Sequence, residues 1–151
     1  MSERIAFKKL VPEAYRAMLG LERYVHGTEL EPALLELVRM RASQLNGCAY
    51  CLDMHSKDAR AAGESEQRLY LLSAWREAPF YSERERAALA WAEAVTLLPG
   101  SGVSDEVYAQ ARIHFGEEEL VKLTMAVVAI NGWNRLEVAF RGEVGSYQAR
   151  A

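Results

Sequence analysis

Two cysteines and a histidine lie close together in the sequence, and their types and spacing suit thiol redox chemistry. Cys48 and Cys51 form a Cys-x-x-Cys pair, and His55 follows four residues after Cys51. On a helix, residues three or four apart share a face, so the two thiols would be neighbours and His55 would lie one turn beyond Cys51. A thiol beside a second thiol and a base is typical of a redox site, because the thiolate is the reactive form.

The residue before this pair indicates how the thiols could ionise. Asn46-Gly47 is a typical helix end, so a new helix is expected to begin at Cys48. The free N–H groups and the positive dipole end of a first helical turn favour a thiolate over a thiol. Because this effect falls off within a turn, Cys51 needs additional help. His55 can accept the Cys51 proton, directly or through a water.

A histidine in this role is usually oriented by a carboxylate behind it. Asp53 and Asp58 point elsewhere around the same helix, so the orienting acid is expected from the neighbouring helix. Glu36 is a candidate because it lies at the edge of a buried face. Periodicity alone does not choose Glu36 over Glu31.

The apolar pattern predicts an all-α chain of about six or seven helices, because no segment alternates with a period of two. Ser82 and Glu85 match a capping box, which places a helix start at Ser82. A short lead, residues 1–11, precedes the first helix, and residues 141–151 are predicted to be polar and frayed. The predicted helices span about 12–26, 32–46, 48–62, 66–77, 83–98 with a stop at 99–102, 105–115 and 117–140.

Length and composition predict a single domain, residues 1–151, with a core of ordinary size. Half of the residues are apolar, 26% are charged, and the net charge is -3. The basic residues form no cluster, so neither nucleic acid nor an anionic membrane surface is an expected partner. No apolar run reaches the ~18 residues of a spanning helix, and the N-terminus lacks a signal-peptide pattern. We expect a soluble, cytoplasmic protein.

Stability is a poor reason for the cysteine pair, because a disulfide across Cys-x-x-Cys closes a very small loop. A secreted disulfide scaffold would carry more cysteines, spread over distant loops. Two other structural explanations exist. The cysteines could be small buried residues of a helix, or Cys48, Cys51, His55 and a carboxylate could bind zinc. Structural zinc sites usually draw ligand pairs from separate elements, which argues against the second.

The spacing Glu36-x11-Cys48-x2-Cys51-x3-His55 resembles that of the AhpD-like alkyl hydroperoxidases of the carboxymuconolactone decarboxylase superfamily. Four positions at fixed spacing are far more specific than a lone Cys-x-x-Cys. Other segments also resemble the small single-domain members, so the resemblance spans most of the chain. These segments are residues 41–55, 75–79, 82–89 and 131–135.

The resemblance implies an AhpD-like fold and a peroxidase mechanism. Cys51 would attack the peroxide and become a sulfenic acid, and Cys48 would resolve it to a disulfide. Glu36 and His55 would form the proton relay. The sequence departs from the best-known members at Tyr50, where they carry a histidine. Tyr50 can donate a hydrogen bond but is a poor base near neutral pH.

The same resemblance bears on cofactors and partners. Sulfur carries the electrons, so no metal, haem or flavin cofactor is implied. The reductant in related enzymes is a lipoyl-bearing protein or a small dithiol, and family members assemble as trimers or hexamers. We therefore predict a homo-oligomeric, peroxiredoxin-type hydroperoxide reductase. Two alternatives remain open: acid-base decarboxylation of a muconolactone-type acid, which needs no Cys pair, and a non-enzymatic helical oligomer whose disulfide reports redox state.

Overall fold

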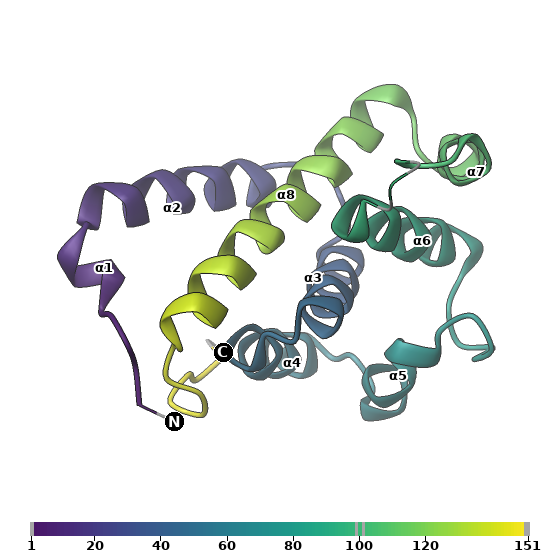
Figure 1. Ribbon diagram of the computed structural model, residues 1–151. Coiled ribbons are helices and arrows are strands. Elements are labelled where there is room, and N and C mark those ends of the chain that lie inside the picture. Colours follow the sequence, from purple (N-terminus) through teal and green to yellow (C-terminus); the bar gives the residue numbers. More distant parts are fainter. Residues whose placement is uncertain (1, 99, 101, 150–151) are drawn as a thin grey trace.

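Prolines, glycines and short polar residues set the ends of most helices in the computed structural model, which describes residues 2–98, 100 and 102–149. Eight α-helices and one 3₁₀ turn occur within these residues, and no strand does (Figure 1). The predicted all-α class is confirmed. The elements are α1 Phe7–Leu10, α2 Pro12–His26, α3 Pro32–Asn46, α4 Ala49–Ala61, α5 Glu66–Leu71, η1 Leu72–Ala74, α6 Glu83–Leu97, α7 Asp105–His114 and α8 Glu117–Phe140.

Local sequence explains the helix starts. Pro12 and Pro32 occupy the first turns of α2 and α3, where a missing N–H costs nothing. Ser82 and Glu85 form the expected capping box at the start of α6. Ser65 and Ser104 accept backbone N–H bonds at the starts of α5 and α7. Short-range chemistry of this kind is why the predicted starts agree with the structure.

Helix α3 is the centre of the fold. It packs against α4, α6 and α8, and it carries buried side chains on most sides, among them the charged Arg39. A helix that is buried all round must lie inside the molecule. Figure 1 shows α8 crossing between α2 and the α3–α6 pair, with α4 at one end of α3. The end of α3 and the start of α4 therefore lie where α8 also passes.

Three predicted segments differ from the structure. The lead before Pro12 contains a helical turn, α1, whose Phe7 packs against Phe140 with 5.5 Å between ring centroids. The helix predicted over 66–77 ends at Leu71 and continues as the 3₁₀ turn η1. Tyr81 explains part of this break, because its hydroxyl donates to the Arg68 carbonyl, the acceptor that the Leu72 amide would use in a continuing α-helix.

The third difference concerns the C-terminal segment. Residues 142–149 were predicted to be frayed, but they are hydrogen-bonded to α4. The Gly145 amide donates to Asp53 Oδ2 at 3.1 Å, and Lys57 Nζ donates to the Tyr147 carbonyl at 2.9 Å. Tyr147 Oη donates to Asp58 Oδ1 at 2.7 Å. Residues 150–151, and Pro99 and Ser101 of the predicted stop after α6, lie outside the described residues.

Among the described residues, no helix is long and apolar enough to cross a membrane.

Candidate active site

Gly47 is the residue that positions the two cysteines. It ends α3 in the left-handed region, with φ at +64°, a conformation that glycine adopts without strain. The Gly47 amide donates to the Gln44 carbonyl, and the Cys48 amide donates to the Ser43 carbonyl at 3.0 Å. This pair of bonds is the Schellman motif that terminates many helices. The chain thus turns within one residue, and α4 begins immediately.

Cys48 is the N-cap of α4, and Cys51 lies at the end of its first turn. The Cys51 amide donates to Cys48 Sγ, with 3.4 Å between the two atoms, so a sulfur fills the role that a serine oxygen usually has. Both cysteines are reduced and both are about 1% exposed. The expected first-turn location of the dithiol is confirmed.

The electrostatics of the two thiols differ. The hydrogen bond from the Cys51 thiol lowers the pKa of Cys48 and outweighs the opposing effect of burial; the Cys51 amide and the Asn134 amide add to it. The same thiol–thiol bond raises the pKa of Cys51, and burial raises it further. The prediction that the helix start acidifies the thiols therefore agrees with the structure for Cys48 only. Cys51 holds its proton until another group takes it.

His55 lies one turn after Cys51 and is held by Glu36. His55 Nδ1 and Glu36 Oε2 are 2.8 Å apart. This is the contact expected of a carboxylate that orients a proton-accepting histidine. The prediction that the orienting carboxylate comes from the neighbouring helix is confirmed, because Glu36 belongs to α3. Glu31 instead pairs with Arg84 of α6. With Glu36 ionised, Nδ1–H donates to it and Nε2 is left to accept a proton.

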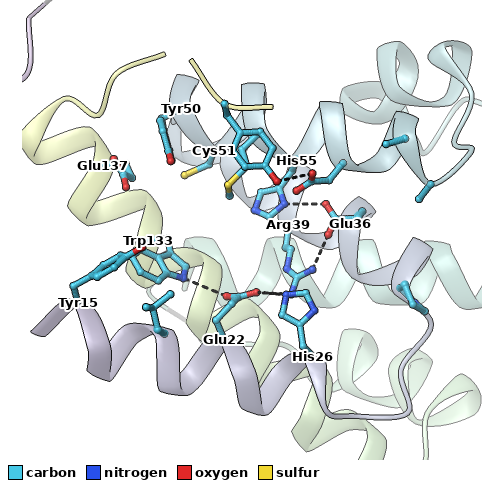
Figure 2. A pocket seen from close by; sticks show the side chains of 17 residues that line it. Tyr15, Glu22, His26, Glu36, Arg39, Tyr50, Cys51, His55, Trp133 and Glu137 are labelled. Atoms are coloured by element: carbon cyan, nitrogen blue, oxygen red, sulfur yellow. Dashed lines mark hydrogen bonds and ion pairs between the residues drawn. The ribbon is translucent and has the colours of Figure 1, made fainter. Parts of the chain in front are cut away.

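Arg39 extends this contact into a chain of charged groups. Arg39 is about 3% exposed and bridges two carboxylates at 2.6 Å each, Glu36 on α3 and Glu22 on α2. The other oxygen of Glu22 accepts a bond from Trp133 Nε1 at 3.2 Å. Figure 2 shows this series of contacts running from His55 down to Trp133. Sequence reasoning missed Arg39, although its position three residues after Glu36 on a buried helix was a usable signal.

The pKa of Glu36 reflects these contacts. Burial alone would raise it, but hydrogen bonds and charge from His55 and Arg39 hold it below its usual range. Glu36 is therefore a carboxylate at neutral pH. It is the form that keeps the His55 tautomer fixed.

This shift predicts an acid-dependent loss of stability. Because the folded pKa of Glu36 lies below the unfolded one, its contribution to stability is complete above the unfolded pKa and is lost as pH falls through the folded pKa. In urea unfolding at a series of pH values, we expect Glu36→Gln to lose less stability than the wild type as pH falls below about 4.5. Glu13→Gln, which changes an exposed acid on α2, should follow the wild-type curve. Parallel curves for Glu36→Gln and wild type would contradict the assignment.

A cavity of about 720 Å³ connects these groups. Its walls combine apolar and aromatic side chains with several ionisable ones, among them Glu36, Arg39 and His55, a combination that small-molecule sites use. Cys51 and His55 both line it, whereas Cys48 does not. Figure 2 shows the His55 ring between Glu36 and the side of the cavity where Cys51 lies. The other lining residues used below are Tyr15, Leu19, Tyr50, Trp133 and Glu137.

Tyr50 lies next to Cys51 and also lines the cavity (Figure 2). The Lys8 ammonium stands over its ring, 4.6 Å from the centroid. A cation on a ring face is a stabilising contact. Tyr50 therefore contributes to the cavity wall and to the placement of Lys8.

One group of three potential metal ligands occurs among the described residues. Atoms of Glu36, His55 and Asp58 lie within 4.8 Å of one another. The group differs from the zinc alternative considered above, because it includes neither cysteine. Two of its members already have strong partners: Glu36 is bound by Arg39, and Asp58 accepts from Tyr147. Each carboxylate of the cluster is therefore already bound by another side chain of the protein.

Comparison with known proteins decides the family. The model of the carboxymuconolactone decarboxylase family matches residues 12–94, which include Glu36, both cysteines and His55. The chain belongs to this family. YdfG of Bacillus subtilis, an uncharacterised protein, is 42% identical over 97% of this chain and 99% of its own length.

Solved structures agree with this assignment. A protein of unknown function from Agrobacterium tumefaciens, which carries a provisional description as an antioxidant defence protein AhpD, is 46% identical, with a TM-score of 0.93 over 97% of this chain and all of that one. A peroxidase-related AhpD core from Ralstonia eutropha is 18% identical, with a TM-score of 0.81 over 92% of this chain and 74% of that one. The second likeness shows the fold alone. The protein is thus an AhpD-like family member with a Cys-x-x-Cys pair.

Proposed function

We propose that this protein is a thiol-dependent peroxidase that reduces hydroperoxides with its Cys48–Cys51 pair. One observation carries the proposal: Cys51 and His55 line the same cavity, and Glu36 orients His55 for proton transfer. Because the pKa of Cys51 is raised, a base must remove its proton before it can react. His55, through Nε2, is that base. The described residues show no direct Cys51–His55 hydrogen bond, so the proton passes through a water or the substrate itself.

The proposed reaction consists of one two-electron oxidation by the peroxide, disulfide formation and a reduction. The Cys51 thiolate attacks the terminal peroxide oxygen, the O–O bond breaks, and Cys51 becomes a sulfenic acid. His55 returns the proton to the departing alkoxide, which leaves as an alcohol. Cys48 then attacks the Cys51 sulfur, the S–O bond breaks, and a disulfide and water form. A dithiol, small or lipoyl-bearing, reduces the disulfide by thiol exchange and leaves as its own disulfide.

The size of the cavity supports an organic peroxide as substrate. A volume of about 720 Å³ exceeds what hydrogen peroxide requires, and Tyr15, Leu19 and Trp133 offer apolar surface for an alkyl or aryl group. The dithiol argues against decarboxylation, which needs acid-base groups only.

Peroxide consumption tests the proposal directly. The reduced wild-type protein is mixed with cumene hydroperoxide and dihydrolipoamide, and loss of peroxide is followed. We expect many turnovers per protein and, without the reductant, consumption of one peroxide per protein with a mass loss of two hydrogens. Hydrogen peroxide should react more slowly than cumene hydroperoxide. Formation of the disulfide without turnover would instead favour the redox-reporting oligomer, and no reaction of either thiol would refute a peroxidase.

A further inference from the structure

Glu137 of α8 is a buried carboxylate with one oxygen left without a partner. The residue is about 3% exposed, and its Oε1 pairs with Lys8 Nζ at 2.8 Å. Its Oε2 has no hydrogen-bond partner among the described residues. Leaving a buried carboxylate oxygen unpaired costs stability, so a fold keeps such a group where chemistry needs it.

The location of Glu137 supports a role at the dithiol. It lines the cavity that Cys51 lines, and Figure 2 shows its carboxylate beside Tyr50 and Cys51, on the side away from His55 and Glu36. Its charge acts on both thiols, raising the pKa of each. The titratable groups that face it are Lys8 from α1 and Tyr50 and the two cysteines from α4.

The chain also leaves room for this carboxylate. A Cβ added at Gly142 would lie 1.9 Å from Glu137 Oε2 and 3.4 Å from the Tyr50 ring. As long as the Glu137 carboxylate keeps this position, only a residue without a side chain fits there. The Gly142 amide donates to the Glu137 carbonyl, which holds the two residues together. The free oxygen is thus built into the fold.

The second step of the proposed reaction has a proton that His55 is not placed to take. At rest, the Cys51 thiol donates to Cys48 and keeps the pKa of Cys48 low. Once Cys51 is oxidised, its thiol no longer donates, and burial and the Glu137 charge both raise the pKa of Cys48. Cys48 must then lose a proton before it can attack. Asn134, one turn before Glu137 on α8, hydrogen-bonds to Cys48, so Cys48 lies on the α8 side of the dithiol, where Glu137 is, and among the described residues no hydrogen bond joins it to His55.

We propose that Glu137 accepts the Cys48 proton while Cys48 attacks oxidised Cys51, so the site has two proton relays, one for each cysteine. The S–S bond forms as the bond from Cys51 to its leaving group breaks, and the Cys48 proton passes to Glu137. The departing hydroxide takes a proton from solvent and leaves as water. Glu137 returns the Cys48 proton to solvent, and Lys8 stabilises the resulting carboxylate. This inference rests on the dithiol chemistry of the proposed function and adds a positioning and proton-accepting residue to it.

The aromatic disulfide dithionitrobenzoate tests the attack of Cys48 on oxidised Cys51 separately, because it requires no peroxide. Cys51 attacks the reagent and releases one coloured thiolate, and Cys48 then displaces a second from the mixed disulfide. The two releases are resolved by stopped flow over a pH series. In Glu137→Gln, we expect the first release to stay within about twofold of wild type. We expect the second release to slow by ~100-fold or more near neutral pH, the smallest effect typical of a lost general base. At high pH, where hydroxide replaces the base, the two proteins should converge.

Two controls separate this role from structure and from charge. Glu93→Gln removes another buried carboxylate, which lies on α6 and is paired with Arg41 and Arg76. This variant should leave both releases unchanged. Gly142→Ala, which displaces the carboxylate without removing it, should slow the second release as Glu137→Gln does. Loss of the Glu137 charge alone would lower the pKa of Cys48 and speed the second release.

The outcomes are therefore distinct. A second release that is unchanged or faster in Glu137→Gln, or that is absent in the wild type, would overturn the proposal. If Glu137→Gln does not fold, Gly142→Ala decides by the same criterion. A slowed second release in a protein that ignores peroxide would support the Glu137 relay and refute the peroxidase.

Discussion

Replacing Cys51 by serine is expected to abolish peroxide turnover, with a loss of more than about 1,000-fold in kcat/KM. A serine hydroxyl keeps the volume of the thiol but is a far weaker nucleophile near neutral pH. Cys51 is the cysteine that lines the cavity beside His55, so an incoming peroxide meets it first. Peroxide loss with dihydrolipoamide as reductant measures the effect.

Cys48→Ser is the matched variant. It should also lose turnover, but it should consume one peroxide and accumulate a sulfenic acid at Cys51, which dimedone traps for mass spectrometry. Cys51→Ser should give no such adduct. The experiment can distinguish the two cysteines, because the lowered pKa of Cys48 means that it ionises more easily than Cys51 in the reduced protein. A trapped sulfenic acid at Cys48 in Cys51→Ser would transfer the nucleophile to Cys48.

Removing Arg39 is expected to produce the largest loss of stability of any single change discussed here. Arg39→Met would leave the carboxylates of Glu22 and Glu36 facing each other without the cation that separates them. Breaking a buried ion pair by deleting one partner costs about 3–5 kcal/mol. The Arg39 side chain is 4% exposed, so solvent cannot replace it. Urea unfolding at neutral pH measures the loss.

The same change should affect the site. Without Arg39, the pKa of Glu36 rises and its hold on His55 weakens, so the rate of sulfenic acid formation should fall as well. Arg39→Lys keeps the charge but cannot span two carboxylates with a planar fork, and an intermediate loss is expected. Arg60→Met breaks an exposed pair with Glu66 and should cost less than ~1 kcal/mol. Equal losses in Arg39→Met and Arg60→Met would contradict the account.

Local chemistry made much of this structure predictable. Pro12, Pro32, Gly47 and the Ser82–Glu85 box act within a few residues, so the helix starts follow from the sequence. The Glu36–His55 contact was also expected, although the choice of Glu36 came from family spacing. The catalytic roles of these residues stay predictions.

Other features depend on contacts between distant residues. The Tyr81 hydroxyl takes the Arg68 carbonyl, which the fourth predicted helix would need to continue past Leu71. Asp53 and Lys57 fix a C-terminal segment that reads as frayed because its own sequence is polar. Glu137 follows Cys51 by more than eighty residues and reaches it only because α8 crosses the end of α3. No local pattern marks such a residue, so only the folded chain brings it to the site.

The sulfur that caps α4 links redox state to backbone motion. In the reduced protein, Cys48 Sγ anchors the Cys51 amide and so secures the first turn of α4. In the disulfide, that sulfur is bonded to Cys51 and can no longer ionise, so its hydrogen bond to the amide cannot gain the strength of a charged acceptor. Oxidation should therefore let this helix end fray. Local unfolding of the first turn of α4 would expose the buried disulfide to the reductant. Reduction would restore the cap and bury the thiols again.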